Sequence, residues 1–171
     1  TRDFYTLDAK IDEVARALGV MDFGMDTDVT DLSGGQRTKI LLAKLLLEKP
    51  DILLLDEPTN YLDAEHIAWL KRYLQEYENA FVLISHDIPF LNDVINIVYH
   101  VENQDLVRYA GDYDNFQSVY AMKKAQLEAA YERQQKEIAD LQDFVNRNKA
   151  RVATRNMAMS RQKKLDKMEI I

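Results

Sequence analysis

The sequence predicts an α/β domain followed by a long helical arm, and three patterns support this prediction. Two short apolar runs, at 52–55 and 81–84, have the length and composition of buried strands. An amphipathic helical segment separates them, which is the order expected of parallel strands joined by a right-handed crossover. From Tyr113 to about Asn148 neither proline nor glycine occurs, and good helix formers dominate.

The composition excludes several classes of protein. A chain of 171 residues has room for one globular domain or for a smaller domain with an extension. No apolar run approaches the roughly 18 residues of a membrane span, and none matches the apolar core of a signal peptide. The absence of cysteine excludes disulfides and thiolate metal sites and fits a cytoplasmic protein. The first residue is Thr1 rather than methionine, which suggests a fragment or a processed chain.

The net charge of −7 is unevenly distributed. Residues 146–171 carry eight basic and two acidic side chains, a net charge of +6, so residues 1–145 carry −13. The basic residues are Arg147, Lys149, Arg151, Arg155, Arg161, Lys163, Lys164 and Lys167. An acidic body with one basic end predicts an anionic partner for that end only.

The first third of the chain predicts two helices around a loop. Residues 8–18 place apolar side chains on one helical face, and Gly19 follows as a candidate C-cap. The Asp- and Gly-rich stretch 21–31 is expected to be a loop. A second helix is predicted over 38–48, ended by Lys49 and Pro50.

The middle of the chain completes the α/β domain. Both apolar runs are expected to be strands buried on two faces. Asp63 can cap the helix between them, whose inner face would be Ile67, Leu70, Leu74 and Tyr77. A β-hairpin is predicted from 97–101 and 105–109. We place the boundary near Gly111, giving an α/β domain over residues 1–111 and a helical arm over 112–171.

The arm carries a heptad-like apolar stripe. Its members lie at steps of three and four residues, with Lys124 and Gln134 at the two skipped positions: Tyr120, Leu127, Tyr131, Ile138, Leu141 and Val145. Such a helix needs a partner, and the simplest partner is a return helix that begins near Met157. The prediction is an antiparallel α-helical coiled coil with a basic tip.

Leu32-Ser33-Gly34-Gly35-Gln36 is the sharpest candidate for a phosphate-binding segment. Two glycines let backbone amides approach a phosphate closely, and the positive end of the following helix points to the same place. The Ser33 hydroxyl adds a donor. The alternative is a flexible Ser-Gly-Gly turn that only caps a helix.

Acidic residues and a histidine follow the two predicted strands. Asp56 and Glu57 come directly after the first run, and His86 follows the second. Because ligands of parallel sheets bind at the carboxyl ends of strands, these side chains are expected to lie together. Asp56 could then hold Mg²⁺ through water, Glu57 could deprotonate an attacking water, and His86 could contact a γ-phosphate. Taken singly, each could equally be an ordinary surface residue.

In this order and spacing, the motifs resemble the ATP-binding cassette family. Residues 32–36 match its signature motif, whose five residues contact ATP: Leu32, Ser33, Gly34, Gly35 and Gln36. Residues 52–56 match its Walker B strand, Glu57 its catalytic glutamate, Asp63 its D-loop aspartate and His86 its switch histidine. The resemblance therefore implies a partial P-loop NTPase-like cassette, with a helical subdomain, parallel strands and a C-terminal hairpin.

The family's phosphate loop is absent from this sequence. No G-x-x-x-x-G-K-[ST] segment occurs, and no glutamine loop precedes the signature. In the family, the signature contacts ATP held by the opposite cassette. The resemblance thus implies half of two composite sites, with ATP and Mg²⁺ bound only when the missing half is present and the isolated chain inactive.

Residues 56–63 resemble the ABC-F branch, which commonly reads E-P-T-N-H/Y-L-D after the Walker B aspartate. ABC-F proteins join two cassettes in one chain by an antiparallel helical linker, and the arm after Gly111 resembles that linker. The implied identity is the second half of a first cassette with most of the linker. Two alternatives remain: a transporter cassette with a C-terminal extension, and a chromosome-maintenance ATPase of the SMC type, in which the coiled coil instead precedes the signature.

The ABC-F resemblance implies a translation factor in the cytoplasm. Its expected partners are ATP, a second cassette in the same chain, and the ribosome and tRNA at the linker tip. The eight basic residues of 146–171 fit RNA phosphates, although a basic helix is often only a solvated face. No membrane partner is expected. An uncovered apolar face is expected to promote self-association.

Overall fold

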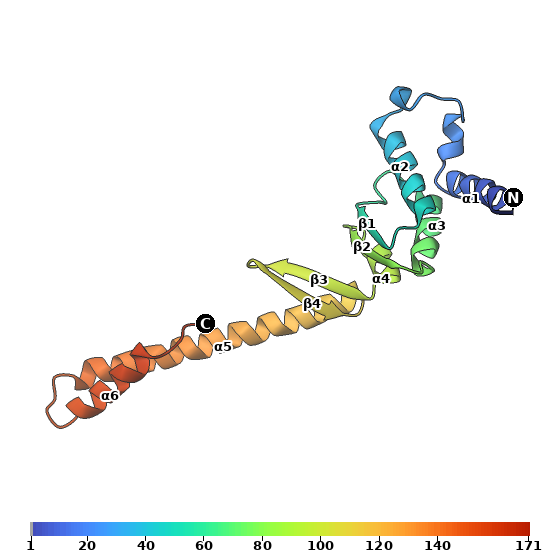
Figure 1. Cartoon of the computed structure of the whole chain (residues 1–171). Helices are drawn as coiled ribbons and strands as arrows, with labels where there is room; N and C mark the ends of the chain where they lie inside the picture. Colours follow the sequence, from blue (N-terminus) through green and yellow to red (C-terminus); the bar gives the residue numbers. More distant parts are fainter. Residues whose placement is uncertain (1) are drawn as a thin grey trace. The chain divides into compact units, whose positions relative to one another are not determined.

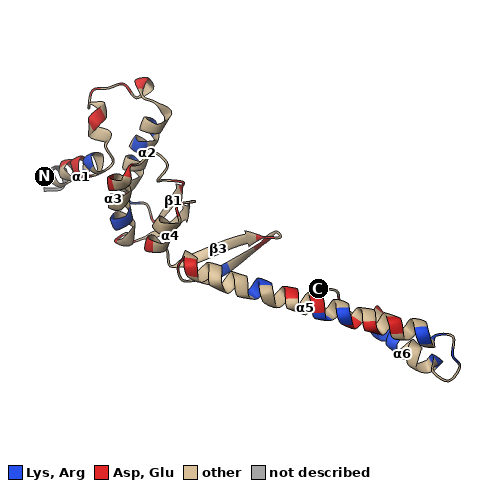
Figure 2. Ribbon diagram, turned by 180° about the vertical axis from the view of Figure 1, so that it is seen from behind, with Lys and Arg blue, Asp and Glu red and all other residues tan. Residues whose placement is uncertain are grey.

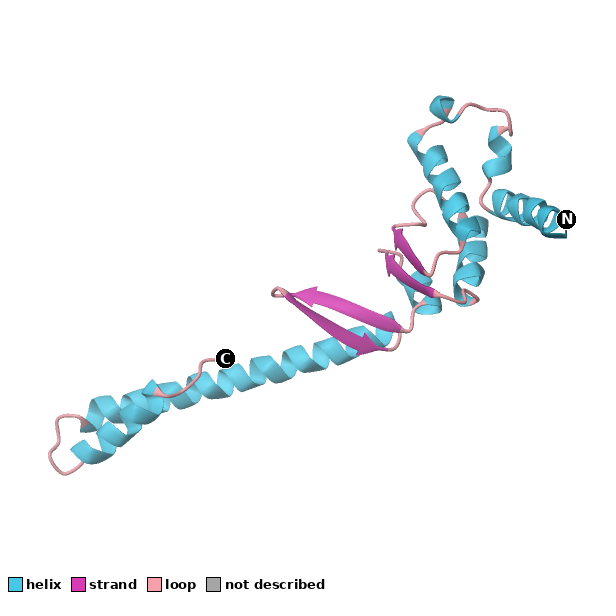
Figure 3. Cartoon of the chain, in the orientation of Figure 1, coloured by secondary structure: helices cyan, strands magenta, loops and turns pink. Residues whose placement is uncertain are grey.

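The computed structural model describes the backbone of residues 2–171 and the side chains from Thr6 onward (Figure 1). The chain separates into two compact units, one extending to Asp114 and one spanning Asn115–Ile171. All four described strands lie in the first unit, and the second is helical (Figure 3).

Helix α1 (Arg2–Ala17) opens the first unit and ends as the sequence predicts. The Gly19 amide donates to the carbonyl of Arg16 at 3.2 Å, and Gly19 has a left-handed φ of 71°. That conformation favours glycine because it has no Cβ. The stretch expected to be a loop contains two 3₁₀ turns, η1 (Val20–Phe23) and η2 (Val29–Asp31).

Helix α2 (Gly34–Glu48) begins four residues earlier than predicted. The early start has a local cause: the Gln36 amide donates to Ser33 Oγ at 3.2 Å, and the Ser33 amide donates to Gln36 Oε1 at 3.0 Å. This reciprocal capping box satisfies two amides that a helix start otherwise leaves unpaired. It offsets the low helix propensity of the two glycines, which had placed the predicted start at Thr38.

Strands β1 (Ile52–Asp56) and β2 (Ala80–Ile84) form a parallel two-stranded sheet. The register pairs Ile52 with Ala80 and Asp56 with Ile84, so both strands end at the same edge. One face is buried, with Leu53 fully buried and Leu55 5% exposed. That face packs into the core formed with α1, α2, α3 (Ala64–Gln75) and α4 (Ile88–Val94).

The other face of this sheet is exposed in the described chain. Its exposed fractions are 62% for Ile52, 67% for Leu54, 54% for Val82 and 57% for Ile84. The prediction that both strands are buried on two faces is therefore wrong for this chain. The apolar pattern is that of a sheet with layers on both sides, and only one layer lies within the described residues.

Two tyrosines of α3 fix the chain segment that leads into β1. The Tyr73 hydroxyl donates to the carbonyl of Leu46 and the Tyr77 hydroxyl to that of Pro50, both at 2.6 Å. Burial raises the pKa of Tyr73 to about 12. These bonds hold the start of β1 against α3 and thereby help to set where Asp56 and Glu57 emerge.

Helix α4 was not predicted from the sequence. It has only 7 residues, too few for a periodic apolar pattern, but its start carries a recognisable signal. The Asp87 side chain accepts from the Phe90 amide at 3.1 Å, and Pro89 occupies the first turn. Aspartate at the N-cap with proline just inside the helix is a standard helix start.

The predicted hairpin is present as β3 (Ile97–Glu102) and β4 (Asp105–Ala110), paired antiparallel. Asn103 and Gln104 form the two-residue turn, with φ of 52° and 67°. Positive φ at both central residues is the type I′ geometry whose twist matches that of the flanking strands. The hairpin leads through Gly111 into the start of α5.

The second unit is a helical hairpin. Helix α5 (Tyr113–Asn148) has the bounds predicted from the sequence, and the return helix α6 (Arg155–Asp166) begins two residues before the expected Met157. The helices are antiparallel, since Glu137 pairs with Lys164 at 2.5 Å and Gln134 bonds the carbonyl of Glu169. Leu141 and Val145 of α5 are buried in this unit, as is Ala158 of α6.

The apolar stripe of α5 is only partly covered. Leu127 and Tyr131 are 58% and 46% exposed, whereas Leu141 and Val145 are 4% and 6% exposed. Within the described residues, the two helices therefore pack against each other along the C-terminal part of α5. A coiled coil along the whole stripe stays a prediction. The polar Gln134 of the stripe is bonded to the end of the chain: its side chain donates to the carbonyl of Glu169 and accepts from the amide of Ile171 at 2.9 Å.

Candidate functional site

Glu57 and His86 meet at the carboxyl edge of the β1–β2 sheet. The Glu57 amide continues the ladder by donating to the carbonyl of Ile84 at 2.8 Å. The His86 amide donates to Glu57 Oε2 at 3.3 Å, and the ring Nδ1 of His86 contacts Glu57 Oε1. The adjacency expected from two parallel strands is confirmed.

The backbone of Glu57 adopts a conformation that is unusual for its side chain. Its φ is 48°, in the left-handed region where most non-glycine residues are uncommon. Such a residue costs on the order of 1–3 kcal/mol and persists where the surroundings hold it in place. Here the bond from its amide to Ile84 and the contacts with His86 hold it, which aims the carboxylate across the sheet edge.

The two side chains differ in their access to solvent. The His86 side chain is 96% exposed, whereas that of Glu57 is 22% exposed. A ligand at this edge would therefore reach the imidazole first. The Glu57 carboxylate is more shielded from solvent, and both of its oxygens contact His86.

Asp56 is the final residue of β1 and is exposed at the same edge. Within the described chain, no group of three or more His, Asp or Glu side chains is arranged to hold a metal ion. Magnesium does not need such a group, because it commonly keeps several waters and uses one or two carboxylates with substrate phosphates. The single accessible carboxylate of Asp56 fits that mode.

Residues 57–63 form a series of tight turns. The Asn60 amide donates to the carbonyl of Glu57 at 3.3 Å, and the Leu62 amide to that of Thr59 at 3.2 Å. Thr59 is buried, with 8% exposure. The segment ends at Asp63, whose side chain caps α3 by accepting from the His66 amide at 3.0 Å. The predicted D-loop aspartate is thus a helix cap in this structure, and its side chain remains 65% exposed.

The start of α2 presents Ser33, Gly34 and Gly35. The Ser33 oxygen accepts from the Gln36 amide as the cap, which leaves the hydroxyl proton for another acceptor. Gly34 faces open space, because a Cβ there would meet no atom within 4 Å. Leu32 is partly buried, and its amide bonds the carbonyl of Val29 at 3.3 Å.

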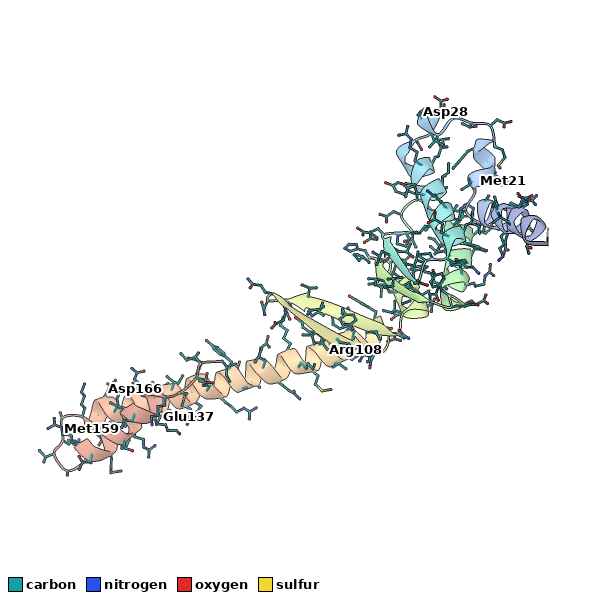
Figure 4. The ribbon with its side chains drawn as sticks, viewed as in Figure 1. Met21, Asp28, Arg108, Glu137, Met159 and Asp166 are labelled. Atoms are coloured by element: carbon teal, nitrogen blue, oxygen red, sulfur yellow. The ribbon has the colours of Figure 1, made fainter. Side chains whose placement is uncertain are left out.

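Two residues that hold the turn before α2 in place were not singled out by the sequence analysis. Asp28, labelled in Figure 4, accepts from the Thr30 amide at 2.9 Å and from the Thr30 hydroxyl at 2.8 Å. The bond from the backbone amide lowers the pKa of Asp28. Arg37 donates to the carbonyls of Val29 at 3.0 Å and Thr30 at 2.7 Å. Asp-x-Thr is a turn signal that could have identified Asp28. Nothing local in the sequence marks Arg37, since its partners are carbonyl oxygens.

Lys and Arg residues are found along both helices of the arm, where Figure 2 draws them in blue, and their side chains have different partners. Arg147 pairs with Asp143, and Lys164 pairs with Glu137. The Arg161 guanidinium lies 5.1 Å from the centre of the Phe144 ring. The other five are exposed and form no ion pair with any residue that the structure describes: Lys149, Arg151, Arg155, Lys163 and Lys167.

Comparison with known proteins matches both units of the chain. Family models described as ABC transporter match residues 2–60 and 99–171. The ABC transporter ATP-binding protein YfmM of Bacillus subtilis is 75% identical over 99% of this chain. The ABC transporter F family member 2 of Dictyostelium discoideum is 40% identical over 92% of this chain. The chain belongs to the ABC-F family of ATP-binding cassette proteins.

Another ABC-F relative is the energy-dependent translational throttle protein EttA of Haemophilus influenzae, 39% identical over 93% of this chain. The chain spans about a third of the length of the Bacillus relative (33%), 28% of the Haemophilus relative and 26% of the Dictyostelium relative. None of the described helices is both long enough and apolar enough to cross a membrane.

Proposed function

We propose that this chain supplies one ABC-F cassette's share of two ATP sites and carries the arm by which its protein binds the ribosome. The contact between Glu57 and His86 at the edge of the β1–β2 sheet supports this proposal most directly. In the proposed hydrolysis of ATP, a carboxylate and an imidazole act close to the same phosphate, and the side chains of Glu57 and His86 are in contact.

At the first site, Glu57 would act as the general base of ATP hydrolysis. Its partly shielded carboxylate can accept the proton of an attacking water, and such bases contribute about 10²- to 10⁴-fold to rates. The exposed His86 ring would orient the γ-phosphate. Magnesium, held through water by Asp56, would neutralise phosphate charge.

At the second site, the start of α2 would bind the ATP held by an opposite cassette. The Ser33 hydroxyl, the open approach at Gly34 and the positive end of α2 all favour a phosphate there. Leu32, Gly35 and Gln36 would complete the segment, and Asp63 would contribute from the turn that precedes α3. The phosphate loop for both sites would come from elsewhere in the protein.

Because no phosphate loop occurs within residues 1–171, we expect this chain alone to bind Mg²⁺-ATP weakly and not to hydrolyse it. A titration followed by calorimetry should show no saturation below about 1 mM, the upper end of typical enzyme KM values. Saturable binding at micromolar ATP would contradict the division into half-sites.

The arm would bring the protein to ribosomal RNA and tRNA in the cytoplasm. Five exposed basic residues without described ion pairs are available for phosphates, and a relative is named as a translational throttle. Val152, Met157 and Met159 are exposed at or near the hairpin bend, at 95%, 54% and 55%, and offer an adaptable apolar contact.

Co-sedimentation with ribosomes tests the proposal in the full-length protein. We expect the protein to pellet with ribosomes when a non-hydrolysable ATP analogue is present and to remain in the supernatant without nucleotide. A transport cassette would show no nucleotide-dependent pelleting, and a chromosome-maintenance ATPase would instead be retained by DNA. Equal pelleting with and without nucleotide would contradict the link between ATP binding and ribosome binding.

A further inference from the structure

Helix α4 contains two side chains that local helix propensity does not explain. Asn92 and Asp93 lie in the second half of a helix of 7 residues, although both residue types are poor helix formers. The Asp93 carboxylate pairs with Lys71 at 2.8 Å, and the Asp93 carbonyl accepts from the Gln75 side chain at 2.9 Å. The Asn92 side-chain oxygen accepts from the Asp114 amide at 3.0 Å. Asp93 therefore binds α4 to α3, and Asn92 binds α4 to the start of α5.

The bond from Asn92 is a helix cap that comes from a different helix. Asp114 is the second residue of α5, and the first amides of a helix have no acceptor within that helix. A cap usually comes from the residue just before the helix. Here the acceptor lies 22 positions away in the sequence, in a helix whose N-cap, Asp87, directly follows His86. Asn92 and Asp114 both belong to the first unit, so this contact lies within one compact body.

Helix α4 is firmly held in the first unit. Phe90 is 1% exposed and Leu91 is 8% exposed, which anchors the helix in apolar surroundings. The Asp87 side chain accepts from the Phe90 amide at 3.1 Å and so fixes the start of the helix. At 1.5 Å per residue, its 7 residues span only about 10 Å. Any movement of the sheet edge that carries His86 is therefore shared by Asn92.

The covalent path between the same two helices is much longer. Residues 95–112 connect α4 to α5 and contain the β3–β4 hairpin. The path turns at Gly111, whose φ of 114° lies in a region that favours glycine. The Gly111 amide donates to the carbonyl of Asn96 at 2.7 Å, which closes the base of the hairpin. The bond from Asn92 to Asp114 adds a direct connection that does not depend on this turn.

We propose that Asn92 is a positioning residue that fixes the first turn of α5 to the helix that follows His86, and thereby couples ATP binding to ribosome binding. This inference rests on the proposed function, in which His86 contacts the γ-phosphate and the arm binds the ribosome. Asn92 contacts neither ligand and takes no part in hydrolysis. Its effect is on the coupling between the two sites, which by thermodynamic linkage is the same in both directions.

Ribosome affinity of the full-length protein, measured with and without a non-hydrolysable ATP analogue, tests this role. The ratio of the two affinities should fall about 2- to 30-fold in Asn92→Ala, the range that corresponds to the loss of a helix cap. The tightening of analogue binding by ribosomes should fall by the same factor. Asn92→Asp keeps an acceptor oxygen for the Asp114 amide and should retain the ratio. ATP hydrolysis without ribosomes should be unchanged in both variants.

Asn79→Ala is the matched control, because it also removes an asparagine side chain that bonds one backbone group, the carbonyl of Pro50 at 3.3 Å. This control should keep the affinity ratio, whatever its melting temperature. The positioning role is wrong if Asn92→Ala keeps the full ratio, if Asn79→Ala lowers the ratio equally, or if Asn92→Asp loses it as well. Equal ribosome affinities with and without the analogue in the unmodified protein would instead contradict the proposed function, and this inference with it.

Discussion

In the full-length protein, Glu57→Gln is expected to lower the rate of ATP hydrolysis by about 10²- to 10⁴-fold and to leave the protein bound to ribosomes in the presence of ATP. The substitution removes the base but keeps the shape. A glutamine oxygen can still accept from the His86 amide, which in the native protein donates to Glu57 Oε2. ATP should therefore still bind, and the step that releases the closed state should fail.

The measurements for this variant are steady-state phosphate release and co-sedimentation with ribosomes in ATP. Glu65→Gln is the matched control: it makes the same change of carboxylate to amide at an exposed position in the first turn of α3. We expect the control to hydrolyse ATP and to leave the ribosome normally. Normal turnover by Glu57→Gln would show that another residue is the base.

Neutralising the arm is expected to weaken RNA binding strongly and to flatten its dependence on salt. The variant combines four exposed residues without described ion pairs: Lys149→Gln, Arg151→Gln, Arg155→Gln and Lys163→Gln. Each lost phosphate contact should reduce the slope of log K against log salt by about 0.7–0.9. Four contacts at near-physiological salt correspond to roughly 10²- to 10³-fold in affinity.

Filter binding of ribosomal RNA by the full-length protein, repeated at several salt concentrations, measures both quantities. A control with Lys10→Gln, Arg16→Gln, Lys44→Gln and Arg72→Gln removes the same total charge from exposed positions of the first unit. The control should change the affinity by only a few-fold and leave the slope as it is. Equal losses in both variants would mean that net charge alone, and not the arm, governs binding.

The features predicted correctly have either a long local signal or a position that parallel strand topology fixes. The bounds of α5 follow from an uninterrupted run of helix formers, and the meeting of Glu57 and His86 follows from two parallel strands ending at one edge. Helix α4 escaped prediction because 7 residues are too few to show periodicity. The start of α2 was placed late because a capping box outweighs two glycines.

Other features depend on contacts that no sequence pattern encodes. Arg37 reaches carbonyl oxygens of Val29 and Thr30, which every residue possesses, so its role is visible only in three dimensions. The Tyr61 ring lies close to Gly35, although the two residues are 26 positions apart in the sequence. The exposure of Leu54 was not predicted because a continuous apolar run is typical of a strand that is buried on both faces.

The bare face of the β1–β2 sheet changes how substitutions in this chain should be interpreted. A charged residue at Leu54 or Val82 would meet only solvent here, since these side chains are 67% and 54% exposed. In a longer protein that lays a further layer on that face, the same charge would be buried without a counterion, at a cost of several kcal/mol. Tolerance measured on this chain would therefore overstate how freely these positions can vary.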